Sequence, residues 1–130
     1  GGAVLYMANL NNANLIKANM EKTDLSKAKL VEAKLFESVL SGAIFCGANL
    51  GLADLKSSNL RDVNFDQANL TKADFRSADL TNANLSGANF TDAKMVNSEF
   101  HGSNFSEDQR RSANFKSYEN KKLSNSAVET

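Results

Sequence analysis

The feature that most constrains this chain is a large apolar residue at every fifth position. Two positions before each stands a small residue, such as Ala68, and Asn or Asp most often stands between them, as at Asn69. A strict internal period of this kind is the signature of a repeat architecture. The series has no missed slot and no insertion, and its members are Leu5, Leu10, Leu15, Met20, Leu25, Leu30, Leu35, Leu40, Phe45, Leu50, Leu55, Leu60, Phe65, Leu70, Phe75, Leu80, Leu85, Phe90, Met95, Phe100 and Phe105.

A period of five residues fits neither an α-helix nor a flat strand. On an α-helix each repeat advances the side chain by about 500°, or about 140° net, which spreads the large residues around every face. On a flat strand an odd period places successive large residues on opposite faces. The many Asn, Asp, Ser and Thr residues further weaken a helical interpretation, because their side chains compete for backbone hydrogen bonds.

One geometry satisfies the pattern: each repeat forms one short extended side and one corner. The large residue then points inward, the small residue fits the crowded space beside it, and the other three positions face solvent. Successive coils would stack at a strand-like spacing of roughly 4.8 Å, with backbone hydrogen bonds between coils. Each buried Leu or Phe is expected to contribute roughly 1.5–3 kcal/mol, and the coils are stable only because they cover one another.

The repeats also resemble those of a known family. Stretches such as Ala68-Asn69-Leu70-Thr71-Lys72 match the motif small–(Asn/Asp)–(Leu/Phe)–X–X, and the chain resembles the pentapeptide-repeat family over residues 3–105, with a further match at Ala113-Asn114-Phe115. The resemblance implies an all-β fold, a right-handed quadrilateral β-helix, with roughly twenty residues per coil and about five coils. Residues twenty apart should then be vertical neighbours. We expect the β-helix over residues 1–117 and a polar C-terminal tail or cap over residues 118–130.

The pattern breaks near its C-terminal end, where Asp108 and Arg110 occupy the small and the large slots. Unpaired charges cannot enter an apolar column. Ser106 followed by an acidic pair and then by Gln109 and two arginines is typical of a capped helix start. Segment 106–112 is therefore predicted to be a bulged loop or a short helical turn. The N-terminal coil begins in phase without a cap and should expose its apolar cross-section and its strand edges.

Composition excludes several classes of protein. Fifteen basic residues balance fifteen acidic ones, so the net charge implies neither a nucleic-acid partner nor an anionic membrane. Cys46 is the only cysteine, which rules out an internal disulfide and a cysteine metal cluster. No apolar run is long enough to span a bilayer, and no signal peptide is visible. The localisation stays open with the cytoplasm slightly favoured, because targeting information could have been lost with the missing end. The chain lacks an initiator Met and starts in mid-pattern, as expected of a trimmed or processed fragment.

No catalytic constellation is visible, so we expect no enzyme activity, no cofactor and no metal. The single histidine, His101, and Cys46 both occupy outward slots, and neither has a partnered base or nucleophile. One side of the rod carries the basic column Lys17, Lys34, Lys56, Arg76, Lys94 and Lys116. Stacked cations can follow phosphates, but Glu37, Asp54 and Asp74 are interleaved without an aromatic ladder. A solvated ion-pair face is favoured, and nucleic acid is not favoured as a partner.

Four successive repeats abandon the Asn/Asp slot, and apolar residues gather there. The slot holds Lys29, Lys34, Val39 and Ile44, and nearby outward slots hold Val31, Phe36, Cys46 and Leu52. An apolar belt on a polar rod predicts a contact surface; the alternative is drift on a tolerant scaffold, because scattered surface apolar residues are normal. We expect Phe36 in the same column as Ile16, and the predicted interface residues are Ile16, Val31, Phe36, Val39 and Ile44.

Three functions stay open at this point. The sequence favours a non-catalytic solenoid scaffold or protein-interaction module that presents side-chain columns to a protein partner or to a second copy. The family resemblance also implies a DNA mimic that inhibits or protects a type II topoisomerase such as gyrase, but that role uses a strongly acidic surface and this chain is neutral. The third is the repeat part of a larger fused protein.

Overall fold

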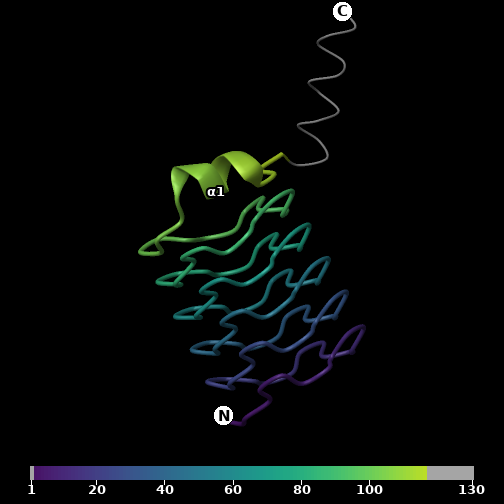
Figure 1. Cartoon of the computed structure of the whole chain (residues 1–130). Coiled ribbons are helices and arrows are strands. Elements are labelled where there is room, and N and C mark those ends of the chain that lie inside the picture. Colours follow the sequence, from purple (N-terminus) through teal and green to yellow (C-terminus); the bar gives the residue numbers. More distant parts are fainter. Residues whose placement is uncertain (1, 117–130) are drawn as a thin grey trace, which may run out of the picture.

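The computed structural model describes residues 2–116 and shows a rod of stacked coils (Figure 1). The extended sides pair through isolated parallel bridges, and every bridge joins residues twenty positions apart, from Val4 with Asp24 to Lys94 with Asn114. One coil therefore takes twenty residues, as predicted. The helix of the described part is α1, Glu107–Ser112. The predicted boundary at residue 117 and the tail 118–130 lie outside the described residues.

Each corner is a hydrogen-bonded turn whose third residue has a positive φ. At the first corner the Ala8 N–H donates to the Leu5 carbonyl at 3.0 Å, and Met7 has a φ of 60°. This is the pattern of a type II turn, and its left-handed residue is costly for any side chain, most of all for a β-branched one. From Met7 to Gly102 this position never carries a β-branched or aromatic residue, whereas the preceding position carries Ile16 and Phe36.

Backbone hydrogen bonds join each coil to the next. The Leu25 N–H donates to the Ile44 carbonyl at 2.6 Å, and the Ile44 N–H donates to the Thr23 carbonyl at 2.9 Å; the same pair of bonds recurs from side to side up the stack. These bonds satisfy backbone groups that a single short side would leave unpaired. The fold therefore needs neighbouring coils, which is why the repeat has to continue in phase.

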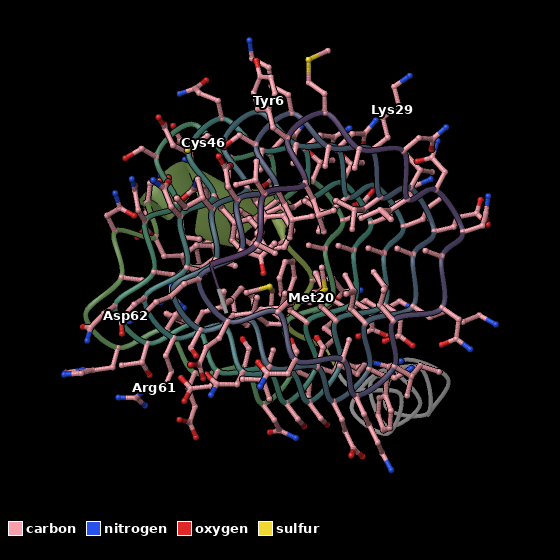
Figure 2. All side chains as sticks on the ribbon, turned by 90° about the horizontal axis from the view of Figure 1, so that it is seen from below. Tyr6, Met20, Lys29, Cys46, Arg61 and Asp62 are labelled. Carbon is pink, nitrogen blue, oxygen red and sulfur yellow. The ribbon has the colours of Figure 1, made fainter. Side chains whose placement is uncertain are left out.

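The large residues of the repeat fill the interior. Leu35 and Phe65 are fully buried, and so is the small-slot residue Val63. A view along the rod shows Met20 pointing inward while Lys29 and Arg61 point away from it (Figure 2). This confirms the inward columns predicted from the period of five.

Phenylalanine rings form part of the core in the C-terminal half of the rod. The rings of Phe45 and Phe65 stack with centroids 5.1 Å apart, and those of Phe75 and Phe90 lie 5.6 Å apart. The N-terminal coils instead have Leu and Met in the same columns. Both kinds of residue fit, because the column demands a large apolar side chain and not a particular shape.

Helix α1 lies across the C-terminal end of the stack (Figure 1). Ser106 is its N-cap: the Ser106 Oγ accepts from the Gln109 N–H at 3.1 Å, and the Gln109 Oε1 accepts from the Ser106 N–H at 2.8 Å. This reciprocal pair is a capping box. Of the two structures predicted for segment 106–112, the short helical turn is the one that forms.

The charged residue in the large slot does not enter the core. The Arg110 guanidinium lies over the rings of Phe100, Phe105 and Phe115, at 5.2, 5.8 and 5.5 Å from their centroids. Cation–π attraction of this kind lets a charge cover an aromatic surface while it stays in contact with water. Arg110 therefore covers the end of the apolar column.

Side-chain amides replace the backbone bonds that are lost where α1 takes the place of one side of the next coil. The Leu85 N–H donates to the Asn104 Oδ1 at 2.5 Å. The Gln109 Nε2 donates to the carbonyls of Leu85 and Ala88 at 2.6 and 3.1 Å. Gln109 thus both caps α1 and closes the open edge of the last coil.

The opposite end of the described rod is open, as predicted. Val4 and Met7 are 72% and 61% exposed, and the core residues Leu5, Leu10 and Leu15 are only partly buried. The two ends of the described rod therefore differ: Arg110 and α1 cover the C-terminal apolar cross-section, whereas the N-terminal one is exposed to solvent.

Candidate interaction surface

The Asn or Asp that precedes each large residue shapes the corner that follows. The Asn69 Oδ1 accepts from the Thr71 N–H at 3.0 Å, and the Asp54 Oδ1 accepts from the Lys56 N–H at 3.1 Å. These are Asx turns, in which a short side chain accepts from the backbone two residues on. Within residues 2–116, no backbone carbonyl accepts from these corner N–H groups. Sequence reasoning recorded the preference for Asn or Asp but missed this reason for it.

The region that abandons the slot gives up these bonds. Lys34, Val39 and Ile44 have no oxygen that could accept from the corner N–H. At the corner after Lys29 the bond is replaced from the neighbouring coil, since the Asn11 Oδ1 accepts from the N–H of the first corner residue at 2.9 Å. The bridges nevertheless continue without a break through this region. The slot therefore adds stability at each corner, and the fold tolerates its loss.

Ile16 and Phe36 lie one above the other at the same corner, as predicted. The Lys17 N–H donates to the Phe36 carbonyl at 2.9 Å, which fixes the two coils in register at this point. Ile16 is 43% exposed, while Phe36 is half-buried, and the Lys56 Nζ lies 5.9 Å from the centroid of its ring. Phe36 thus occupies an outward slot, but one face of its ring is covered by the next coil.

The other predicted interface residues are spread over several sides. Val31 lies at the corner that begins the side carrying Lys34, and Phe36 lies at the corner that ends it. Val39 and Ile44 occupy the middle of the two sides that follow. The structure therefore brings Ile16 and Val31 to the borders of the same side as Phe36, and it does not bring Val39 and Ile44 there. The belt is not one continuous surface.

The structure adds an exposed residue to the border of the Lys34 side. Leu52, 52% exposed, lies at the same corner as Val31, one coil further along the rod. We call the surface bordered by Val31 and Leu52 at one corner and by Ile16 and Phe36 at the other the Lys34 side.

Later coils of the Lys34 side carry ion pairs. The Lys56 Nζ is 3.2 Å from the Asp54 carboxylate, and an Arg76 guanidinium nitrogen is 2.6 Å from the Asp74 carboxylate. Burial of Asp74 opposes its ionisation, but hydrogen bonds from Arg76 and the charges of Arg76 and Lys56 outweigh that effect and hold the pKa of Asp74 below its ordinary value. The predicted ion-pair face therefore forms at Lys56 and Arg76. Asp74 itself is buried, contrary to the expectation that its slot faces solvent.

The residues considered for chemistry stay apart from one another. His101 is exposed at a corner, and burial raises the pKa of the Cys46 thiol, which disfavours the reactive thiolate. Within the part of the chain that the structure describes, no group of three or more His, Cys, Asp or Glu residues could hold a metal ion. No helix among residues 2–116 is long and apolar enough to cross a membrane.

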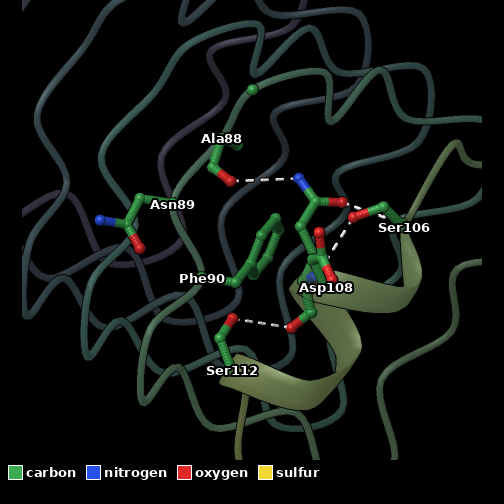
Figure 3. Close-up of a pocket in the computed structure, with 8 residues that line it drawn as sticks. Ala88, Asn89, Phe90, Ser106, Asp108 and Ser112 are labelled. Carbon is green, nitrogen blue, oxygen red and sulfur yellow. Dashed lines mark hydrogen bonds between the residues drawn. The ribbon is translucent and has the colours of Figure 1, made fainter.

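A shallow hollow lies between α1 and the last coil (Figure 3). It is lined by residues 87–90 and by Ser106, Asp108, Gln109 and Ser112. The Ser112 hydroxyl donates to the Gln109 carbonyl at 2.9 Å, and the Gln109 amide is held by the last coil. The hollow is thus part of the cap that closes the rod.

Comparison with known proteins agrees with the architecture. The family profile for pentapeptide repeats matches residues 2–30, 33–71 and 68–107. A crystal structure of a pentapeptide repeat protein from the thylakoid lumen of Arabidopsis thaliana is 28% identical, covers 82% of this chain and 72% of its own length, and gives a TM-score of 0.67. A pentapeptide repeat protein from Nostoc is 29% identical, covers 83% of this chain and 84% of its own, and gives a TM-score of 0.56.

The chain also has a more distant structural match. Full-length QnrB1, a plasmid-mediated fluoroquinolone resistance protein, is 19% identical, covers 97% of this chain and 78% of its own, and gives a TM-score of 0.35. A likeness at that level carries no argument about function. No curated protein matches the chain. The family profile, which spans most of the sequence, and the twenty-residue coil together show that the chain belongs to the pentapeptide repeat family.

Proposed function

We propose that this chain is a non-catalytic scaffold or protein-interaction module, a right-handed rod of about five coils that binds a protein partner or a second copy through the Lys34 side. The observation that supports this is the loss of the Asn/Asp slot from Lys29 to Ile44 in a backbone that is otherwise unchanged. Each lost corner bond gives up about 0.5–1.5 kcal/mol. Within residues 2–116 the inward residues stay buried through these repeats, so we place the reason for the loss on the surface.

The residues that border the Lys34 side have the properties of a binding anchor. Ile16 and Leu52 are exposed, and Phe36 presents the part of its ring that Lys56 does not cover. Aromatic and aliphatic anchors supply most of the binding energy in many protein interfaces. Val39 and Ile44 face other sides, so a partner has to wrap around the rod to reach them.

The test is the replacement Phe36→Ser. It should weaken self-association or partner binding by roughly 2 kcal/mol if Phe36 is a hot spot, measured by sedimentation of the purified rod and by affinity capture. Val96→Ser is the matched control, because Val96 occupies the same column in a later coil. Unchanged association together with an unchanged thermal melt would mean that the apolar belt is sequence drift and not a binding surface. A large fall in melting temperature for Phe36→Ser would mean that the ring is structural.

The alternatives are tested in the same preparation. No observation on this rod favours a topoisomerase-directed DNA mimic, so we expect no inhibition of DNA supercoiling at micromolar protein. Inhibition that weakens at high salt would show that local charge outweighs the neutral total. The third alternative, the repeat part of a larger fused protein, is decided by the full-length sequence.

A further inference from the structure

The Lys34 side carries more cations than its own carboxylates can neutralise. With both bordering corners included, its carboxylates are Glu32, Glu37, Asp54, Asp74 and Asp92, while its cations are Lys17, Lys34, Lys56, Lys72, Arg76, Lys94 and Lys116. Because the whole chain has a net charge of zero, the rest of the chain must carry the compensating negative charge. The positive charge is therefore a property of this side and not of the rod as a whole.

The excess positive charge lies next to the apolar corner formed by Ile16 and Phe36. Asp54 and Asp74 are already engaged by Lys56 and Arg76 further along the side. Within residues 2–116, no carboxylate lies within ion-pair distance of Lys17 or Lys34.

The positions of these two lysines frame the corner. Lys17 directly follows Ile16 in the turn, and Lys34 lies in the middle of the side, two residues before Phe36. Glu37 occupies the same turn position as Lys17 one coil further along, without pairing to it. The apolar pair of Ile16 and half-buried Phe36 is thus framed by two lysines that form no ion pair within residues 2–116.

We infer that the partner of the Lys34 side is an acidic peptide segment with a large apolar side chain, an inference that rests on the function proposed above. The apolar side chain covers Ile16 and Phe36, and its flanking carboxylates reach Lys17 and Lys34. The apolar contact supplies most of the affinity, and the matched charges set the orientation and speed the encounter. The extended backbone around Lys34 is already bonded to the coils on both sides, since the Lys34 N–H donates to the Ala13 carbonyl and the Leu35 N–H donates to the Asp54 carbonyl. Recognition therefore occurs through side chains and not through added strand bonds.

The same surface is poorly suited to nucleic acid. Phosphates are bound by cations and repelled by carboxylates, and in this column Asp54 follows Lys34 directly and Asp74 follows Asp54. Single-stranded nucleic acid also needs open aromatic faces for base stacking. The Phe36 ring already has Lys56 over it.

A phage-displayed library of random peptides tests this directly. The library is selected in parallel on the intact chain and on a Lys34→Glu variant. We expect the retained peptides to be rich in Asp and Glu next to Leu, Phe, Tyr or Trp. The most enriched peptide is then synthesised with a fluorescent label, and its binding is measured by anisotropy at low and at physiological salt, where it should weaken as salt rises.

Matched variants separate charge from apolar contact. Lys34→Glu should weaken binding of the labelled peptide about tenfold or more, since it turns an attraction into a repulsion. Lys29→Glu is the control, because Lys29 occupies the same exposed slot on the preceding side, and it should change binding by less than about twofold. Phe36→Ser should weaken binding about thirtyfold. The thermal melt of every variant must match that of the wild-type chain.

Each other outcome has a definite meaning. Neutral or basic peptides that lose binding with Phe36→Ser but not with Lys34→Glu would overturn the acidic partner and leave the proposed interface standing. Acidic peptides that respond to Lys34→Glu but not to Phe36→Ser would overturn both. An oligonucleotide that displaces the peptide and binds more tightly would overturn the inference in favour of nucleic acid. Failure to enrich any peptide over the Lys34→Glu variant would also overturn it.

Discussion

Residues 29–46 and residues 49–91 share one backbone and differ in what they present to solvent. In the later segment the slot before every large residue holds Asn or Asp, from Asn49 to Asn89, while in the earlier one it holds Lys29, Lys34, Val39 and Ile44. The bridges and corners are nevertheless the same in both. The comparison teaches that the inward columns and the corners determine the fold. The Asn/Asp slot only adds a local hydrogen bond at the corner that follows it.

The largest expected effect concerns what the two segments share. Leu35→Asp and Phe65→Asp should both unfold the rod, because each buries an unpaired charge in a fully buried column. Thr71→Asp should change stability by roughly 0.5 kcal/mol or less, since Asp66 already occupies the same corner slot on the preceding side. Circular dichroism during chemical denaturation measures all three.

Two results would contradict this prediction. If the inward and outward changes were equally mild, the inward columns would be wrong. A mainly helical spectrum of the wild-type chain would contradict the β-helix itself.

Much of this comparison could be predicted from the sequence, because a period of five leaves only one way to bury a single set of residues. The inward columns follow from residue types and spacing, the twenty-residue coil follows from the resemblance to the pentapeptide-repeat family, and the short helix after Ser106 is one of the two structures predicted there. The position of Arg110 over three rings could not be predicted, because the pattern showed only that a charge stood in an apolar slot. The division of the apolar belt among several sides was missed for a different reason. Residue spacing predicts which residues share a column, but it does not predict which way each side of the coil faces.

The corners offer a second shared feature to test. Glu37→Val in the earlier segment and Lys72→Val in the later one should each destabilise the rod by about 1–2 kcal/mol, because both residues have a left-handed φ, 55° and 59°, that a β-branched side chain resists. Ser41→Val is the control at the corner position before the left-handed residue, where β-branched residues already occur, as at Val31. Equal effects of Lys72→Val and Ser41→Val on urea denaturation would show that the left-handed residue does not limit the choice of side chain.

Substitutions at the position before the large residue should change the stability of the rod in opposite directions in the two segments. Val39 and Asn59 lie in the same column on neighbouring coils, and the Asn59 Oδ1 accepts from the Arg61 N–H at 3.1 Å. Val39→Asn should stabilise the rod by about 0.5–1.5 kcal/mol by supplying the missing acceptor to the Ser41 N–H, and Asn59→Val should destabilise it by a similar amount. Urea midpoints with unchanged slopes would report both. A loss of stability in Val39→Asn would mean that the apolar side chain, and not the missing bond, is what this slot needs.

The smallest expected difference is between two serines in one inward column. The Ser58 hydroxyl donates to the Leu55 carbonyl at 2.6 Å, whereas Ser38, one coil earlier, has a buried hydroxyl without a hydrogen-bond partner among residues 2–116. Ser58→Ala should cost about 0.5 kcal/mol, at the low end for a hydrogen bond, because the Leu55 carbonyl keeps its bond from the Ser58 N–H. Ser38→Ala should be neutral or stabilising by about 0.5 kcal/mol, because it removes a polar group that burial leaves unpaired. Alanine is already the most frequent residue of this slot, so neither change strains the column. Paired denaturation curves of the two variants measure the contrast, and equal losses in both would show that the Ser38 hydroxyl has a partner after all.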